Sequence, residues 1–239
     1  MRLVFALLFL GLLASAWAAN IFLGGLAEEE DARIRREHAE KVAVLAPPAE
    51  GGSANAQYKL GVLYLTAHEL VRDPGLAFEW FSRSASSGHA EAQYNLARLY
   101  ELGEGVQQDY GLAARWYGRS AEHANHAEAQ YALGQLNFRG LAPGHSRPKA
   151  LKWFRRAAEG GQPVAQFLVG RMFESGWGVR KDAIKAYMWY SLAERGRDRV
   201  LSENSEYDPT KAREHLAMAM NQSQRDSAVK QAKIWLAAH

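Results

Sequence analysis

One aromatic dipeptide returns four times along the chain at nearly constant spacing. It stands at Trp80-Phe81, Trp116-Tyr117, Trp153-Phe154 and Trp189-Tyr190, so the tryptophans are 36, 37 and 36 residues apart. A second phrase, close to Ala-x-Ala-Gln-Tyr, begins 26 residues before each tryptophan, at positions 54, 90, 127 and 163. Self-similarity at such a period is typical of a solenoid, in which every copy buries its apolar face against its neighbours. The sequence therefore predicts one elongated array of repeats.

Each copy reads as two helices, which makes the predicted fold all-α: a helical-repeat solenoid of four two-helix repeats with a C-terminal helical cap. The predicted repeats cover residues 54–89, 90–126, 127–162 and 163–196. In the second copy Ala92, Leu96 and Leu99 follow the i, i+4, i+7 pattern of an amphipathic helix. A small residue recurs in the middle of each first helix and predicts close approach of the partner helix. These residues are Gly61, Ala97, Gly134 and Gly170.

The aromatic dipeptides lie in the middle of the second helices, predicted over about 75–87, 111–123, 148–159 and 182–195. Large aromatic side chains at such positions are expected between helices of their own and adjacent repeats. The predicted structural core is therefore the column Trp80, Trp116, Trp153 and Trp189. Arginines recur three residues after the first three tryptophans, and we interpret them as solvated. They are Arg83, Arg119 and Arg156.

Glycines mark the turns after the helices. The phrases Gly103-x-Gly105 and Gly176-x-Gly178 follow first helices, where a residue with positive φ ends a helix well. Gly88 and Asn125 hold equivalent places after second helices and predict the same conformation there. No strand precedes these glycines, so a dinucleotide-binding loop is not indicated.

The N-terminus carries an export signal with two readings. Arg2 precedes an apolar run, and a small-x-small site ends at Ala18, which predicts a signal peptide over residues 1–18. Because the apolar character continues, residues 3–26 are alternatively an uncleaved anchor. Either reading predicts a periplasmic or secreted protein, or one anchored in the inner membrane and facing the periplasm. Residues 19–53 would follow as a charged spacer, with Pro47-Pro48 and Gly51-Gly52 breaking any helix into a linker.

The pattern changes after the fourth repeat, and residues 197–239 are predicted to cap the array. Residues 197–207 are polar and loop-like. Asp208-Pro209 then predicts a helix start with an N-cap and a proline in the first turn, and another helix is expected from near Ser223.

The phrase Ala90-Glu-Ala-Gln-Tyr94, the turn Gly103-x-Gly105-Val106 and the closing Trp116-Tyr117 resemble the Sel-one-like repeat family, a branch of the tetratricopeptide-type solenoids. The resemblance implies a right-handed solenoid that acts as an adaptor holding partner proteins, often in bacterial envelopes, host-interaction systems or signalling. One cysteine-rich branch of the family has been linked to penicillin binding and hydrolysis. The alternative function is a cell-wall-directed hydrolase or penicillin-binding enzyme of that branch. The absence of cysteine from this chain argues against it.

No catalytic, metal or cofactor site is predicted. The chain lacks a Gly-x-Ser-x-Gly elbow and a Ser-x-x-Lys box. His123 and His126 have a spacing that could bring two imidazoles to a metal, but helix-end roles explain them better. The net charge of +3 is spread without a basic run, so no nucleic-acid partner is expected.

Positions that differ between copies are free to bind a partner, because stacking does not require them. We therefore predict a partner-binding groove on the first helices, with ordinary solvated surface as the alternative. The candidate groove residues are Lys59, Asn95, Arg98, Gln135 and Arg171. Arginine and asparagine suit hydrogen bonding to a protein or an extended peptide, an acidic one included.

Overall fold

The structure is a computed structural model that describes residues 28–123 and 126–238. Every regular element within these ranges is helical, which confirms the predicted all-α class. The chain divides into two compact units, Met1–Trp80 and Phe81–His239, which we describe separately. The predicted leader, residues 1–18 or 3–26, lies outside the described ranges. Within those ranges, no helix has both the length and the apolar character that a membrane crossing requires.

The first unit contains a helix over residues 28–50, α2 (Ala54–Thr66) and the first half of α3 (Pro74–Ser86). The prediction that Pro47-Pro48 breaks the helix into a linker is wrong. Proline removes a donor, but the carbonyls of Pro47 and Pro48 still accept from the backbone nitrogens of Gly51 and Ser53, both at 3.0 Å. Packing of Leu45 and Ala49 against α2 holds this segment in place, and Ala49 is fully buried. The predicted spacer is thus part of the folded unit.

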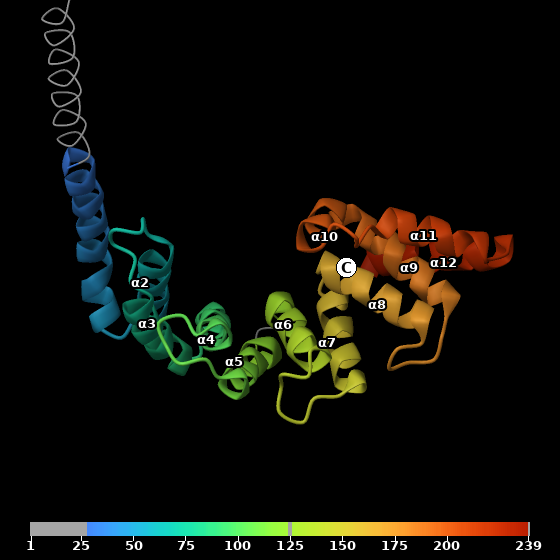
Figure 1. Ribbon diagram of the computed structural model, residues 1–239, viewed down its shortest axis with the longest axis horizontal. Coiled ribbons are helices and arrows are strands. Elements are labelled where there is room, and N and C mark those ends of the chain that lie inside the picture. The colour runs from blue at the N-terminus through green and yellow to red at the C-terminus, as the bar shows by residue number, and fades with distance from the viewer. Residues whose placement is uncertain (1–27, 124–125, 239) are drawn as a thin grey trace, which may run out of the picture. The chain divides into compact units, whose positions relative to one another are not determined.

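The second unit is built from three helix pairs, which follow one another from α4 to α9 in Figure 1. The two helices of each pair pack together, and α5 and α7 also pack on the first helix of the next pair. The pairs are α4 (Ala90–Leu102) with α5 (Tyr110–His123), α6 (Ala127–Phe138) with α7 (Arg147–Glu159), and α8 (Pro163–Ser175) with α9 (Ala183–Ala193).

The glutamine of the repeated phrase joins each repeat to the helix before it. In all four copies its side-chain amide donates to the carbonyl of an alanine near the end of that helix, at 3.0 to 3.2 Å. A buried amide that satisfies a helix-end carbonyl fixes the junction, because leaving either group unpaired is costly. The same bond to Ala49 shows that the helix over residues 28–50 stands where a second helix would precede the first repeat. The pairs are Gln57–Ala49, Gln93–Ala85, Gln130–Ala121 and Gln166–Ala158.

The second aromatic residue of each dipeptide, and not the tryptophan, is the fully buried one. Phe81, Tyr117, Phe154 and Tyr190 are at most 1% exposed. Trp80, Trp116 and Trp153 are only half-buried at the core's edge, so the predicted tryptophan core holds in full for Trp189 alone. Neighbouring helix positions point about 100° apart, which leaves room at the core for one of the two rings. The guanidinium groups of Arg119 and Arg156 lie over the rings of Trp116 and Trp153, 4.4 and 5.1 Å from their centroids.

The small mid-helix residues allow the expected close approach. A Cβ on Gly134 would stand 2.4 Å from the ring of Phe154, and one on Gly170 would stand 2.6 Å from the ring of Tyr190. These separations are much shorter than a normal van der Waals contact, so only glycine, which has no side chain, fits at these two positions. The turn glycines are also as predicted: Gly88 and Gly103 have φ of 88° and 71°. Asn125 lies outside the described residues.

The C-terminal segment holds more helix than predicted. A short 3-10 turn (Glu194–Gly196) leads into α10 (Arg197–Glu203), so the expectation of a loop over residues 197–207 is wrong for its first half. Val200 is fully buried and anchors this turn of helix against α8. The two predicted cap helices are present as α11 (Pro209–Met218) and α12 (Gln222–Ala238), and both pack on α9. Their cover explains why Trp189 alone among the four repeat tryptophans is buried; its ring meets that of Trp235 edge-on, at 6.1 Å.

Candidate binding groove

A polar groove runs between the first helices of the second and third repeats. We call it the α4–α6 groove; it encloses about 450 Å³. Tyr94, Arg98 and Glu101 come from α4, and Tyr131, Ala132 and Gln135 face them from α6. Residues three or four apart on a helix share a face, which is why these side chains line one surface. The remaining lining residues are Tyr117, Glu128, Arg139 and Glu203.

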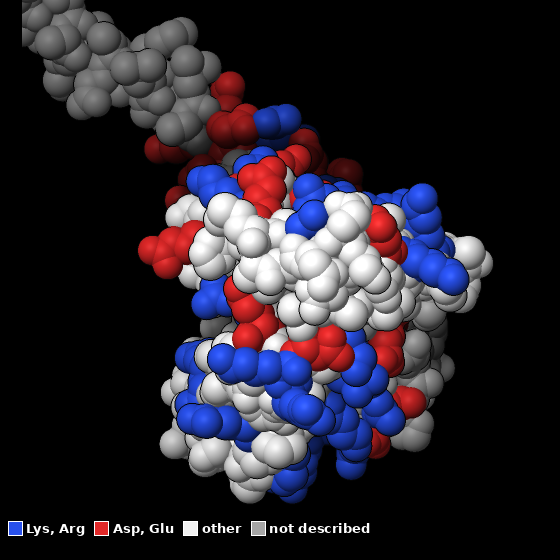
Figure 2. Space-filling model, turned by 90° about the vertical axis from the view of Figure 1, so that its right-hand side faces the viewer, with Lys and Arg blue, Asp and Glu red and all other residues white. Residues whose placement is uncertain are grey.

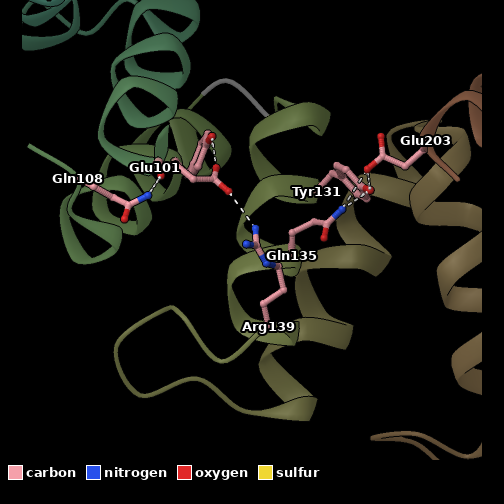
Figure 3. Close-up of polar contacts among 7 residues, drawn as sticks. Glu101, Gln108, Tyr131, Gln135, Arg139 and Glu203 are labelled. Carbon is pink, nitrogen blue, oxygen red and sulfur yellow. Dashed lines mark hydrogen bonds and ion pairs between the residues drawn. The ribbon is translucent and has the colours of Figure 1, made fainter. Parts of the chain in front are cut away.

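Glu101 is fixed in the wall of the groove by two neighbours (Figure 3). One of its carboxylate oxygens accepts from the hydroxyl of Tyr117 at 2.8 Å, and the other lies 3.5 Å from a guanidinium nitrogen of Arg139. Burial, reinforced by the charge of Glu101, raises the pKa of Tyr117, so its hydroxyl stays protonated and donates. The same pairing recurs in the fourth repeat, where Tyr190 donates to Glu174 at 2.6 Å. These carboxylates are structural acceptors.

At the other end of the groove the chain supplies its own carboxylate. Glu203, the last residue of α10, accepts from the hydroxyl of Tyr131 at 2.9 Å and from the side-chain amide of Gln135 at 3.3 Å. Figure 3 shows the two donors side by side on α6, both pointing at Glu203. Burial, together with the charge of Glu203, raises the pKa of Tyr131 and keeps this phenol a donor. Tyr131 and Gln135 therefore form a carboxylate-binding site, and an internal carboxylate occupies it.

An ion pair holds α10 in this place. The guanidinium of Arg197 makes two bonds to the carboxylate of Asp208, at 3.1 and 2.7 Å. This geometry is bidentate, the strongest form of the pair. Hydrogen bonding by Arg197 lowers the pKa of Asp208 to about 2, and Asp208 also caps α11 by accepting from the backbone nitrogen of Thr210 at 3.1 Å. Because one carboxylate joins both ends of the segment 197–208, the position of Glu203 is set by the fold.

A smaller hollow continues the groove toward the fourth repeat. We call it the aromatic pocket; it encloses about 220 Å³. Phe138 at the end of α6 and Trp177 in the loop after α8 meet with ring centroids 4.9 Å apart. Tyr207, whose ring lies 5.0 Å from that of Phe167, closes one side. The other lining residues are Phe154, Leu168, Arg171, Met172 and Ser175.

The structure brings some predicted groove residues together and separates others. Arg98 and Gln135 line the α4–α6 groove, and Arg171 lines the aromatic pocket. Asn95 is half-buried on α4 and lines neither of these hollows. Lys59 is exposed on α2, which belongs to the other unit. The predicted single row of five residues is therefore reduced to three residues in two adjoining hollows.

Sequence reasoning missed Glu203, Phe138 and Trp177. Glu203 reaches Tyr131 across 72 positions of the chain, and no local pattern indicates such a contact. The two aromatic residues had a signal, because the corresponding positions of the second copy hold Glu101 and Glu104.

The side chains that line the α4–α6 groove are suited to binding a peptide. They offer hydroxyl, amide and guanidinium donors beside three carboxylates, an arrangement suited to hydrogen-bonding a peptide. Across residues 28–123 and 126–238, no group of three His, Cys, Asp or Glu side chains is placed to hold a metal ion. His126 caps α6, with its Nδ1 accepting from the backbone nitrogen of Ala129 at 3.2 Å, while the side chain of His123 lies outside the described residues.

Two solved structures of bacterial proteins are similar to this chain. A Sel1 repeat protein from Oxalobacter formigenes has 30% identity over 70% of this chain and 70% of that chain, with a TM-score of 0.61. A protective antigen of uropathogenic Escherichia coli strains, with an SLR fold, has 28% identity over 81% of this chain and 48% of that chain, with a TM-score of 0.60. A comparison with curated proteins gives no match.

The model of the Sel1 repeat matches four consecutive segments, residues 54–89, 90–125, 127–162 and 163–198. These segments make up more than half of the chain, and their limits agree with the four repeats predicted from the sequence within two residues. The chain belongs to the Sel1 repeat family.

Proposed function

We propose that this protein is a non-catalytic scaffold that binds a segment of a partner protein in the α4–α6 groove. Proteins of the Sel1 repeat family are generally protein-interaction scaffolds, and the fold is typically non-enzymatic. The observation that carries the proposal is the bond from Tyr131 and Gln135 to Glu203, because it is an example of a carboxylate held by this face of the first helices.

The open part of the groove would hold the partner through Arg98. This side chain is exposed, lies on the same face as Tyr94, and differs from its counterparts Val62 and Gln135, so stacking does not require it. Arginine offers a planar fork of donors that matches a carboxylate. A partner segment with an acidic residue near Arg98 would fit this donor, beside the Tyr131–Gln135 site that Glu203 occupies. A preformed surface of this kind lowers the ordering cost of binding.

Affinity capture with a matched pair of variants tests the proposal. The tagged chain is used as bait, and retained proteins are identified by mass spectrometry. Arg98→Ala removes the open donor of the groove, and Gln135→Ala removes one of the two donors that hold Glu203; each is worth roughly 1–3 kcal/mol when its partner is charged or left buried. We expect capture of the specific partner to fall at least about tenfold. The control, Arg115→Ala with Gln107→Ala, removes the same two residue types from exposed positions outside the groove. Equal losses in both variants would contradict the proposal.

We further propose that the scaffold works in the cell envelope, in the periplasm or at its inner membrane. The support is the apolar run after Arg2 and the small-residue site ending at Ala18. Fractionation of cells that express a C-terminally tagged chain should recover it outside the cytoplasm, shortened if residues 1–18 are removed. Full-length product in the cytosol alone would overturn this part of the proposal.

A further inference from the structure

Two positions of the third and fourth repeats carry aromatic residues, one exposed and one half-buried, where the second repeat carries glutamates. Phe138 corresponds to Glu101, and Trp177 corresponds to Glu104. The stack tolerates a glutamate at each place, so the array does not require the aromatic rings. Phe138 remains 54% exposed. Large apolar groups on the surface that packing does not explain indicate an interaction site.

The repeats explain why position 138 is not a glutamate, but they do not explain why the ring of Phe138 is exposed. Glu101 accepts from Tyr117, whereas Phe154 at the equivalent place has no hydroxyl to donate. An apolar residue opposite Phe154 is therefore expected, and in the first copy, where Phe81 follows the tryptophan, Leu65 serves at this position. Phe138 touches Phe154 at a centroid distance of 6.4 Å, yet it extends past it to Trp177.

The aromatic pocket has the size of one side chain. Its volume of about 220 Å³ lies below the roughly 300–1,000 Å³ of pockets that hold drug-sized ligands. Phe138, Trp177, Leu168 and Met172 make the lining mostly apolar, and the exposed Arg171 on α8 is its cation. A large apolar side chain would fill it, with a carboxylate next to that side chain meeting Arg171.

The segment of the chain that supplies most of the pocket's lining residues is basic. Residues 139–185 hold ten Lys or Arg and three Asp or Glu, a balance of +7 in a chain whose total is +3. All three acids already have partners: Glu159 pairs with Arg155, Glu174 accepts from Tyr190, and Asp182 pairs with Lys185. Figure 2 shows Lys and Arg gathered over the lower half of the face that it presents. Such a surface favours a negatively charged partner and speeds its association.

We propose that the aromatic pocket docks an acidic peptide segment through one large apolar residue, with a neighbouring Asp or Glu on Arg171. The inference rests on the proposed scaffold function and names the chemistry of the partner. The pocket adjoins the α4–α6 groove through Tyr131, Gln135 and Tyr207, which line the hollow between them, so one extended segment could reach both.

A selection of random peptides displayed on phage, against the immobilised full chain, tests the inference. We expect enriched peptides to carry a Leu, Phe or Trp beside Asp or Glu. A synthetic copy of the dominant peptide is then titrated by fluorescence anisotropy. Trp177→Glu and Arg171→Gln install the residues of the second and third copies, so both variants should fold. We expect each to weaken binding at least about tenfold, as for a buried anchor of an interface. Binding should also weaken as salt is added.

The controls make the same chemical changes elsewhere. Met218→Glu removes an exposed apolar side chain outside the pocket, and Arg115→Gln removes another exposed cation. Peptide binding that is lost in the controls as readily as in the pocket variants overturns the inference. Binding that depends on Arg98 and Gln135 but not on Trp177 overturns it while leaving the scaffold proposal in place. A selection that enriches no apolar–acidic peptide also overturns it, and the affinity capture above then decides the scaffold proposal separately.

Discussion

Gly170 provides a stability test of the close packing between the two helices of a repeat. In the change Gly170→Ala the new Cβ would stand 2.6 and 2.7 Å from the Cε1 and Cδ1 atoms of Tyr190, whereas ordinary contact begins at 3.4 Å. The ring cannot swing away easily, because Tyr190 is fully buried and its hydroxyl donates to Glu174 at 2.6 Å. The helices must therefore separate or the ring must leave its preferred rotamer.

Two effects of opposite sign decide the outcome. Alanine is better than glycine in a helix by about 0.8–1.0 kcal/mol. Forcing an extra methyl group into a well-packed core costs about 1–3 kcal/mol. We expect the packing cost to win, with a net destabilisation of up to about 2 kcal/mol. For a chain of this size that corresponds to a fall in melting temperature of up to roughly 8 °C.

The matched control is Gly118→Ala in α5. A Cβ there would have nothing within 4 Å, so only the helix-propensity gain remains. We expect this variant to unfold at a slightly higher temperature than the parent, by circular dichroism at equal protein concentration. Solenoids can unfold in steps, so the comparison uses the transition of the whole curve. If Gly170→Ala is as stable as Gly118→Ala, the close approach of α8 and α9 does not limit the packing, and our reasoning about the small residues fails.

Two further results are expected from the polar contacts of the second unit. Tyr190→Phe should cost about 0.5–1.5 kcal/mol, because Glu174 loses its donor. Adding Glu174→Leu, the combination of Leu65 with Phe81 in the first copy, should recover most of that loss; a double-mutant cycle in urea measures it, and additive losses would contradict the pairing. The Arg197–Asp208 pair should make unfolding sensitive to acid. The pKa of Asp208 is about 2, below its usual value near 3.9, so the stabilisation is full above about pH 4 and disappears as the pH falls toward about 2. Asp208→Asn should flatten that part of the pH profile, and an unchanged profile would show that the pair contributes nothing.

The repeat pattern predicted the architecture because it follows from strong local signals. A period of 36 or 37 residues, two helical faces per copy and turn glycines determine where each helix pair lies. The first helix of the cap, beginning at Asp208-Pro209, was predicted for the same reason. The close helix approach at Gly134 and Gly170 was predictable, because glycine is costly in a helix and recurs only where it is needed.

The errors lie where tertiary contacts override local signals. Pro47-Pro48 has the local signature of a helix end, but packing on α2 keeps the helix continuous to residue 50. The choice between Trp116 and Tyr117 as the buried ring depends on where the neighbouring helix lies, which the spacing does not reveal. At the candidate site, the equivalence of Arg98 and Gln135 in the repeats correctly brought them to one groove. The return of Glu203 to this groove involves a contact over 68 positions and could not be read from the pattern.

The most direct test of the central claim, binding in the α4–α6 groove, is site-specific photo-crosslinking in living cells. A photoreactive amino acid replaces Ala132, which lines the groove on α6, or Gly118, which lies on α5 and is not among the residues lining the groove. The account predicts one dominant crosslinked partner from position 132 and little or none from position 118. That product should disappear when Arg98→Ala and Gln135→Ala are added. A partner captured from position 118 and not from position 132 would contradict the account.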